Sequence, residues 1–177
     1  MKGKNKLNLG CGDDYREDMI NIDIDKSKKA DIHCNLEKGI PVKDNSIEYI
    51  FTRHCLEHLH QEYFTFMINE MKRVCKNGAI IEIYLPYFTS FLYFRTMTHY
   101  TPMTLTTFDG LGFEVINKKM YFFRVSYPYK ENKVANTLRI FNPILSFLPN
   151  TFPRIYERLF CWTYPMEELY FKLKVNK

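Results

Sequence analysis

Two stretches near the N-terminus carry residues suited to binding a nucleotide. Gly10-Cys11-Gly12 follows a short apolar run, and glycine lets the backbone approach a ligand closely because it has no side chain. Asp23 ends the next apolar run, where a carboxylate can accept hydrogen bonds from ribose hydroxyl groups. Each feature alone is most often just a turn or a cap. In this order along the chain, they predict a site for a nucleotide-type cofactor.

A cluster of ionisable residues follows later in the chain. His54, Glu57 and His58 come just after a predicted strand, and spacings of three and four place them on one helical face. Imidazoles suit proton transfer near neutral pH, so His54, His58 and the more distant His99 are candidate catalytic residues. In the alternative interpretation, Glu57 and His58 only cap or position the following helix. His54, nearest the strand, is also expected to border the cofactor.

The strands that position these residues are indicated by apolar or β-branched runs that end in glycine, a carboxylate or proline. They are predicted at residues 6–10, 20–24, 31–36, 46–52, 79–85, 112–123 and 169–175. The last run alternates apolar residues with Lys172 and Lys174, as expected of an antiparallel strand that closes the sheet. We therefore predict an α/β fold, a Rossmann-like three-layer sandwich with a mostly parallel sheet.

Two helices are predicted between these strands. Apolar residues at helical spacing predict a helix over residues 61–76, with Asn77-Gly78 as its C-terminal cap. A second helix is predicted over residues 101–110, with Thr101 as its N-cap.

The first crossover is unusually short, because only residues 13–19 separate Gly12 from the second strand. Parallel strands usually need a connection of about a dozen residues or more. The first helix is therefore predicted to be shortened or missing.

Composition favours one domain over residues 1–177, with residues 130–165 as a basic, aromatic insertion before the last strand. The net charge is +5, and from Lys118 onward eleven basic residues face four acidic ones, a net charge of +7. Five cysteines form no CxxC pair, which argues against a thiolate zinc site and favours a reducing compartment. We expect a cytoplasmic protein, with peripheral membrane contact through the basic C-terminal third as an option.

Three motifs resemble the class I methyltransferases, particularly their type 11 group. They are LNLGCG at residues 7–12, NIDID at 21–25 and HCLEHL at 54–59, and the resemblance spans residues 6–120. It implies S-adenosylmethionine as cofactor. The residues it assigns to cofactor binding are Leu9, Gly10, Cys11, Gly12, Asp23, Ile24, Asn35, Leu36 and His54.

The charge of the glycine loop agrees with that cofactor. Asp13 and Asp14 stand where a dinucleotide motif continues toward its third glycine, and their carboxylates would repel a pyrophosphate. S-adenosylmethionine instead carries a sulfonium and an ammonium group.

The histidine cluster is also similar to the Glu-x-x-Glu-His metal motif of some O-methyltransferases, with His54 in place of the first Glu. Metal binding by Glu57 and His58 is the lesser hypothesis beside a metal-free site. It needs a further ligand such as His99.

The function predicted from these features is S-adenosylmethionine-dependent methyl transfer to a small-molecule or glycan-type acceptor, with O-methylation favoured. The alternative is a catalytically inactive module that binds a membrane surface or a protein partner through its basic C-terminal third. A nucleic-acid substrate is not favoured, because apolar residues dilute the basic ones and no known nucleic-acid-binding motif is present. The sequence does not predict the oligomeric state.

Overall fold

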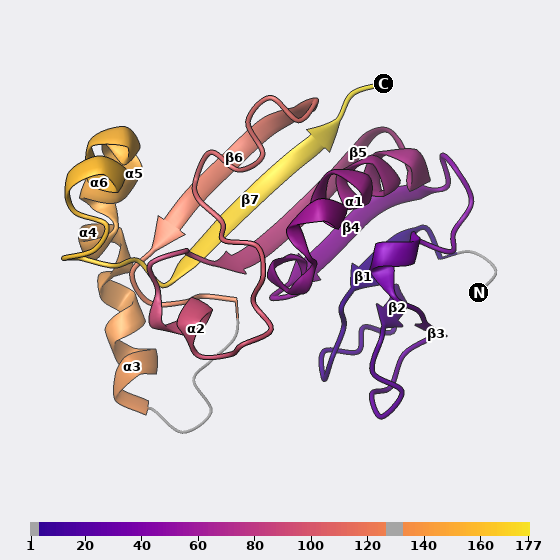
Figure 1. Ribbon diagram of the computed structural model, residues 1–177, viewed down its shortest axis with the longest axis horizontal. Helices are drawn as coiled ribbons and strands as arrows, with labels where there is room; N and C mark the ends of the chain where they lie inside the picture. Colours follow the sequence, from indigo (N-terminus) through magenta and orange to yellow (C-terminus); the bar gives the residue numbers. More distant parts are fainter. Residues whose placement is uncertain (1–3, 127–132) are drawn as a thin grey trace.

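The computed structural model describes residues 4–126 and 133–177 and contains a seven-stranded sheet in the order β3-β2-β1-β4-β5-β7-β6 (Figure 1). The strands are β1 (Lys6–Leu9), β2 (Ile20–Asp23), β3 (Ile32–His33), β4 (Ile47–Arg53), β5 (Cys75–Pro86), β6 (Phe113–Tyr121) and β7 (Glu168–Val175). β7 lies between β5 and β6 and runs antiparallel to both, whereas the pairings from β3 to β5 are parallel. The predicted α/β fold with a mostly parallel sheet is confirmed, but the last strand does not close the sheet, because β7 is inserted between β5 and β6 and β6 forms the edge.

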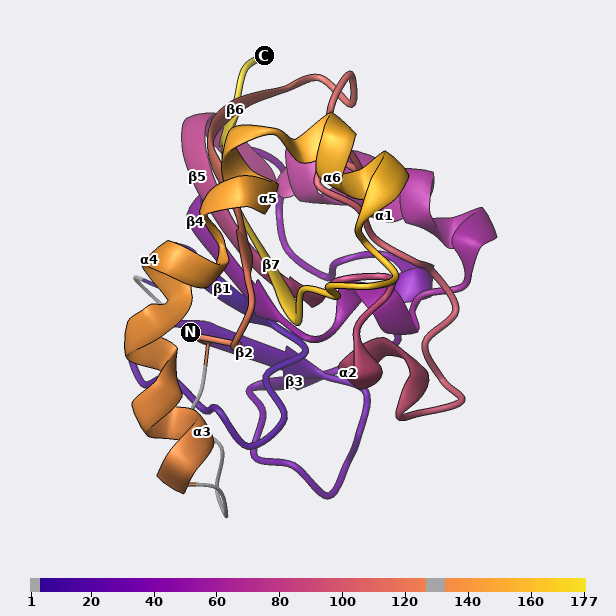
Figure 2. The same cartoon turned by 90° about the vertical axis from the view of Figure 1, so that its left-hand side faces the viewer.

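Helices flank this sheet. They are α1 (Gln61–Val74), α2 (Phe91–Phe94), α3 (Lys133–Leu138), α4 (Asn142–Leu145), α5 (Phe147–Thr151) and α6 (Pro153–Leu159), with short 3-10 turns η1 (Leu36–Lys38), η2 (Leu56–His58) and η3 (Arg139–Phe141). Viewed along the sheet, α1 and α6 lie to one side of the strands and α3 and α4 to the other (Figure 2).

The regular spacing of apolar residues in β5 and α1 explains how these two elements form the core. Alternate β5 residues, including Ile81 and Ile83, are fully buried, and so are Met67 and Met71 on one face of α1. A two-residue period in the strand and a period of three to four in the helix each place their apolar side chains on a single face. Burial of these two faces fixes α1 against the sheet.

The predicted C-terminal cap of α1 is wrong. The helix ends at Val74, and β5 begins at once with Cys75, so Asn77 and Gly78 belong to the strand. Gly78 has a φ of +80° next to an irregularity in the pairing of β4 with β5. Gly78 therefore allows a bend in the strand. Such a bend and a helix cap both need a residue with positive φ, which is why the sequence did not distinguish them.

The predicted helix at residues 101–110 is also wrong, since this segment forms turns. The Thr101 hydroxyl donates to the Leu59 carbonyl (2.7 Å) and does not cap a helix. Thr104 and Thr107 bond within the segment, where the Thr104 N–H donates to the Thr107 hydroxyl (2.8 Å). Such local bonds compete with the helical pattern.

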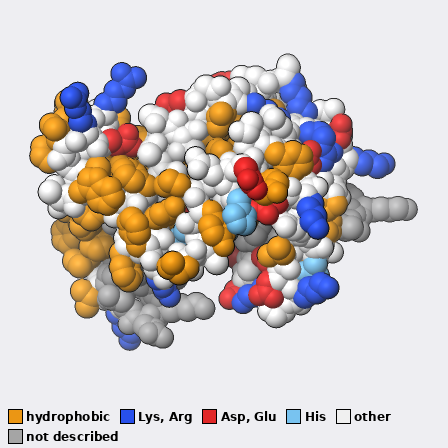
Figure 3. All heavy atoms as spheres, in the orientation of Figure 1, with side chains coloured by type: hydrophobic (Ala, Val, Ile, Leu, Met, Phe, Trp, Pro, Cys, Tyr) orange, Lys and Arg blue, Asp and Glu red, His pale blue; other side chains and the backbone are white. Residues whose placement is uncertain are grey.

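The predicted insertion lies between β6 and β7 and folds, over its described part, into α3 to α6; residues 130–132 lie outside the described residues. Many of its apolar side chains are exposed, and they gather on the surface over these helices (Figure 3). Among the described residues, no helix is long and apolar enough to cross a membrane.

Because β7 lies inside the sheet, a cavity made there is expected to lower the free energy of unfolding strongly. Phe171 is fully buried with its ring 4.7 Å from that of Phe108, so Phe171→Ala is expected to lower the free energy of unfolding by about 3–5 kcal/mol. The control is Phe91→Ala, because Phe91 is 76% exposed. Urea unfolding of both variants measures the difference; similar losses would contradict this description of the core.

Candidate functional site

The connection from β1 to β2 is held by polar side chains, and residues 10–19 contain no helix, as predicted. Asn8 and Asn21 are buried and bonded to each other (3.0 Å). The Asn8 amide also donates to the Asp14 carbonyl (2.6 Å), and Asn21 accepts from the Arg16 N–H (2.9 Å) and donates to the Arg16 carbonyl (2.8 Å). Two strand side chains thus satisfy the backbone of a loop that lacks a helix.

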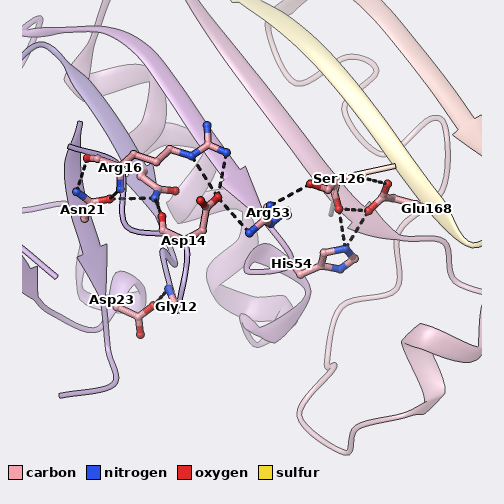
Figure 4. A network of polar contacts seen from close by, with 10 residues as sticks. Gly12, Asp14, Arg16, Asn21, Asp23, Arg53, His54, Ser126 and Glu168 are labelled. Atoms are coloured by element: carbon pink, nitrogen blue, oxygen red, sulfur yellow. Dashed lines mark hydrogen bonds and ion pairs between the residues drawn. The ribbon is translucent and has the colours of Figure 1, made fainter. Parts of the chain in front are cut away.

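Asp14 and Arg16 extend this network across the sheet edge (Figure 4). Arg16 pairs with Asp14 (2.9 Å), and its guanidinium lies 3.5 Å from the centre of the Phe51 ring. Arg53, at the end of β4, pairs with the same carboxylate (3.1 Å). The acidic loop is therefore partly neutralised by arginines on the side of Asp14.

The glycine loop and Asp23 meet directly. The Gly12 N–H donates to Asp23 Oδ2 (2.7 Å), and the Asp25 N–H donates to Asp23 Oδ1 (2.9 Å). A carboxylate has about four acceptor positions, so two backbone donors orient Asp23 and leave capacity for a ligand. Gly10 has a φ of +65°, and an added Cβ would lie 2.4 Å from Cys55 Sγ. Only glycine fits there.

A cavity of about 700 Å³ opens beside these residues. Its lining includes seven of the nine residues predicted to bind the cofactor, namely Gly10, Gly12, Asp23, Ile24, Asn35, Leu36 and His54. Leu9 and Cys11 are buried outside it, and the Cys11 thiol lies 3.6 Å from the Lys29 carbonyl. The backbone of Cys11 is also engaged within the chain, because its N–H donates to the Ile22 carbonyl (3.1 Å) and its carbonyl accepts the Asp14 N–H (2.8 Å).

Several lining residues were missed by the sequence analysis. They are Asp25, Cys34, Glu37, Cys55, Leu59, His60, Thr98 and Tyr100. The rings of His60 and Tyr100 stack with their centres 4.2 Å apart, and His60 Nδ1 lies 2.7 Å from Glu37 Oε1. Asn35, one of the residues predicted to bind the cofactor, uses its side-chain oxygen to accept the Glu37 N–H (2.9 Å). The carboxylate of Glu37, just beyond β3, is visible in the sequence, but its position in the cavity wall depends on the 3-10 turn η1.

His54 is enclosed by two buried carboxylates. Its Nε2 lies 3.0 Å from Glu168 Oε1 and its Nδ1 lies 3.3 Å from Glu57 Oε1. Burial lowers the pKa of His54, but these two carboxylates outweigh it and raise the pKa to about 9. The backbone of His54 is left-handed, with a φ of +49°, which a non-glycine residue adopts only under constraint. His54 is therefore charged and fixed, and it joins the end of β4 to β7 (Figure 4).

The other two catalytic candidates lie beside Glu57. His58 lines the cavity, and its ring centre is 4.6 Å from that of His99. His99 Nδ1 lies 2.7 Å from the Tyr93 carbonyl, while His99 Nε2 lies 3.9 Å from Glu57 Oε1. The fold thus brings together His54, His58 and His99 from two separate loops, as the catalytic hypothesis requires.

The enclosed ion pairs of His54 predict a stability effect. His54→Ala is expected to lower the free energy of unfolding by about 3–5 kcal/mol, because it leaves two carboxylates buried without their cation. His60→Ala is the matched control and is expected to change it by about 1 kcal/mol or less, since the pair of His60 with Glu37 is half-exposed. Chemical denaturation distinguishes the two, and an equally small loss for His54→Ala would show that the pairs contribute little.

The chain is similar to known methyltransferases, in sequence over part of its length and in fold. Residues 7–83 match the family model described as a methyltransferase domain. No curated protein matches the chain. Among solved structures, an S-adenosylmethionine-dependent methyltransferase from Archaeoglobus fulgidus is similar with a TM-score of 0.62 and 17% identity, over 98% of this chain and 87% of that one.

Two further structures share the fold. Phosphoethanolamine N-methyltransferase 2 of Haemonchus contortus, in complex with S-adenosylmethionine, has a TM-score of 0.61 and 16% identity, over 99% of this chain and 49% of that one. A putative methyltransferase from Haloferax volcanii, in complex with the Trm112 methyltransferase activator, has a TM-score of 0.61 and 11% identity, over 99% of this chain and 84% of that one. Residues 7–83 therefore match a methyltransferase domain, and the chain shares the fold of S-adenosylmethionine-dependent methyltransferases.

Proposed function

We propose that this chain is an S-adenosylmethionine-dependent methyltransferase that acts on a hydroxyl oxygen of a small-molecule or glycan-type acceptor. The observation that carries the proposal is that one cavity is lined both by Gly10, Gly12 and Asp23 and by His58, whose ring lies beside that of His99. A nucleotide-type ligand held by the glycine loop would share this cavity with the imidazole of His58.

The residues around the glycine loop fit S-adenosylmethionine. The cavity of about 700 Å³ is within the range of about 300–1,000 Å³ usual for small-molecule sites. Asp23 has acceptor capacity for a ribose, and the carboxylates of Asp25 and Glu37 add negative charge to the lining. When bound, the cofactor supplies a methyl group that passes from its sulfonium to a lone pair of the acceptor, while the electrons of the broken bond stay on sulfur.

A hydroxyl acceptor must also lose a proton, and the imidazoles differ in their ability to take it. His99 Nδ1 faces a carbonyl, which only accepts, so Nδ1 carries the proton and Nε2 keeps its lone pair. Burial lowers the pKa of His99 and keeps it neutral. His54 is held between carboxylates and acts as a positioning residue. His58 and His99 are therefore the proposed bases.

The inactive-module alternative is not favoured, because the matched family segment includes the complete glycine loop and Asp23. The first connection is short, but the side chains of Asn8 and Asn21 hold its backbone in place by hydrogen bonds. What distinguishes the two interpretations is turnover: an active enzyme transfers labelled methyl groups to hydroxyl-bearing acceptors, and a binding module does not.

The role of Asp23 gives a test of cofactor binding that does not require the acceptor. Asp23→Ala is expected to weaken S-adenosylhomocysteine binding by on the order of tenfold or more, since it removes an ionised acceptor and releases the Gly12 N–H. Asp18→Ala is the control, because Asp18 is exposed and pairs with Lys6. Isothermal titration calorimetry measures both. Equal affinities, or no binding by the unchanged chain, would contradict the proposed site.

We also propose that the helical segment after β6 rests on a membrane surface. Among the described residues, twelve of the twenty large apolar side chains that are exposed lie between Val134 and Trp162. Soluble monomers seldom expose contiguous apolar surface on this scale. Four basic residues, Lys133, Arg139, Arg154 and Arg158, stand among them against the single acid Glu157. Apolar side chains with interspersed basic residues are typical of contact with anionic lipid.

This surface predicts binding to vesicles that contain phosphatidylglycerol. Ile144 and Phe147 are 74% and 63% exposed, so the double variant Ile144→Asp, Phe147→Asp is expected to reduce the sedimented fraction several-fold. Ile116→Asp, on β6, is the control. Binding should also fall with added salt and with uncharged vesicles. No sedimentation of the unchanged chain, or the same sedimentation by both variants, would overturn the proposal.

A further inference from the structure

We propose that Glu57, His58 and His99 bind a divalent transition-metal ion in the wall of the cavity. One possible ligand atom from each residue lies within 4.8 Å of the other two. The three come from η2 and from the loop after α2, which the Tyr100 and Thr101 N–H groups hold together by donating to the Glu57 carbonyl (2.8 and 3.2 Å). The backbone therefore fixes the relative position of the three residues.

Glu57 carries the strongest indication of a missing cation. Its side chain is fully buried, and neither carboxylate oxygen has a hydrogen-bond partner among the described residues. Oε1 has His54 Nδ1 at 3.3 Å as an ionic neighbour, but Oε2 has no such neighbour among the ion pairs of the described residues. Buried carboxylates without donors are costly, and coordination of a metal is one of the few arrangements that satisfies them.

His99 is oriented as a metal ligand. Its Nδ1 donates to the Tyr93 carbonyl (2.7 Å), which leaves the lone pair on Nε2, 3.9 Å from Glu57 Oε1. Ligating histidines usually donate their other ring nitrogen to such a carbonyl, because this fixes the tautomer and the ring. Bonds of about 2.0–2.2 Å from a metal to each of two ligands span up to about 4.2 Å, so this pair already has a suitable separation.

His58 completes a set of two imidazoles and one carboxylate on the cavity side. Its Nδ1 lies 3.0 Å from both the carbonyl and the hydroxyl oxygen of Thr98, which also lines the cavity. Imidazole with carboxylate favours zinc, manganese, iron or cobalt over magnesium. Three protein ligands leave coordination positions open, as in sites that act on a substrate. This inference rests on the proposed function and changes one step of it: with the metal bound, His58 and His99 would act as its ligands in place of free bases, and an acceptor hydroxyl bound at an open position would lose its proton more readily.

The test measures the metal alone. Chelator-treated chain is titrated with Co²⁺, whose visible absorption reports its ligands, and with Zn²⁺ by calorimetry. We expect one equivalent to bind. His99→Ala and His58→Ala should each weaken binding by at least on the order of 10–100-fold, the loss typical of removing even a supporting partner. The matched control is His33→Ala, an exposed histidine on β3, which should bind as the unchanged chain does.

The variants guard against misfolding in two ways. His58 is exposed, so its replacement should leave the fold intact, and Glu57→Gln keeps the side-chain shape while removing its charge. Circular dichroism of each variant, and S-adenosylhomocysteine binding measured without metal, separate a failed metal site from a failed cofactor site. No binding of Co²⁺ or Zn²⁺ at millimolar concentration, or equal binding by the His99→Ala and His33→Ala variants, would overturn the proposal.

Discussion

The contact between two buried amides, Asn8 and Asn21, is the constraint on which the site depends. A connection of ten residues between parallel strands has no room for the usual crossover helix, so its backbone groups need other partners. Asn8 and Asn21 supply them through bonds to Asp14 and Arg16. Because the loop is fixed at this end, Gly12 can reach Asp23 at the other, and the carboxyl edge of the sheet remains in the arrangement that a nucleotide-type ligand requires.

The sequence predicted this edge well because its signals are local. Glycines after an apolar run and an acid after the next one need only parallel neighbouring strands to meet, and β1 and β2 are such neighbours. His54, Glu57 and His58 were likewise adjacent in the sequence. Their meeting with His99 was only a hypothesis, because it depends on how the loop after α2 folds back onto η2, which no periodicity records.

The errors have a common physical origin in residues that serve two conformations equally well. Gly78 satisfies a helix cap or a bent strand, and threonine hydroxyls cap helices or bond within turns. In both wrong predictions, contacts with distant residues determined the conformation. Cys75 at the start of β5 pairs with Ile47 of β4, and the Thr101 hydroxyl is bonded to the Leu59 carbonyl. Glu168 shows the same limit, since nothing in the alternation of the last strand indicates that its first residue lies buried beside His54, about 114 positions away in the chain.

That distant pair links the cavity to the helical segment after β6. Glu168 Oε2 accepts the N–H groups of Val125 and Ser126 (2.7 and 3.0 Å), and Arg53 donates to the Ser126 carbonyl (3.0 Å). The chain that leaves β6 is therefore tied to the ends of β4 and β7 before it enters the exposed apolar helices. Arg139, in η3, bonds back to the Val125 carbonyl (2.6 Å). A surface that contacted lipid through these helices would be held at a fixed position relative to the cavity, because polar contacts around a single buried carboxylate join the two.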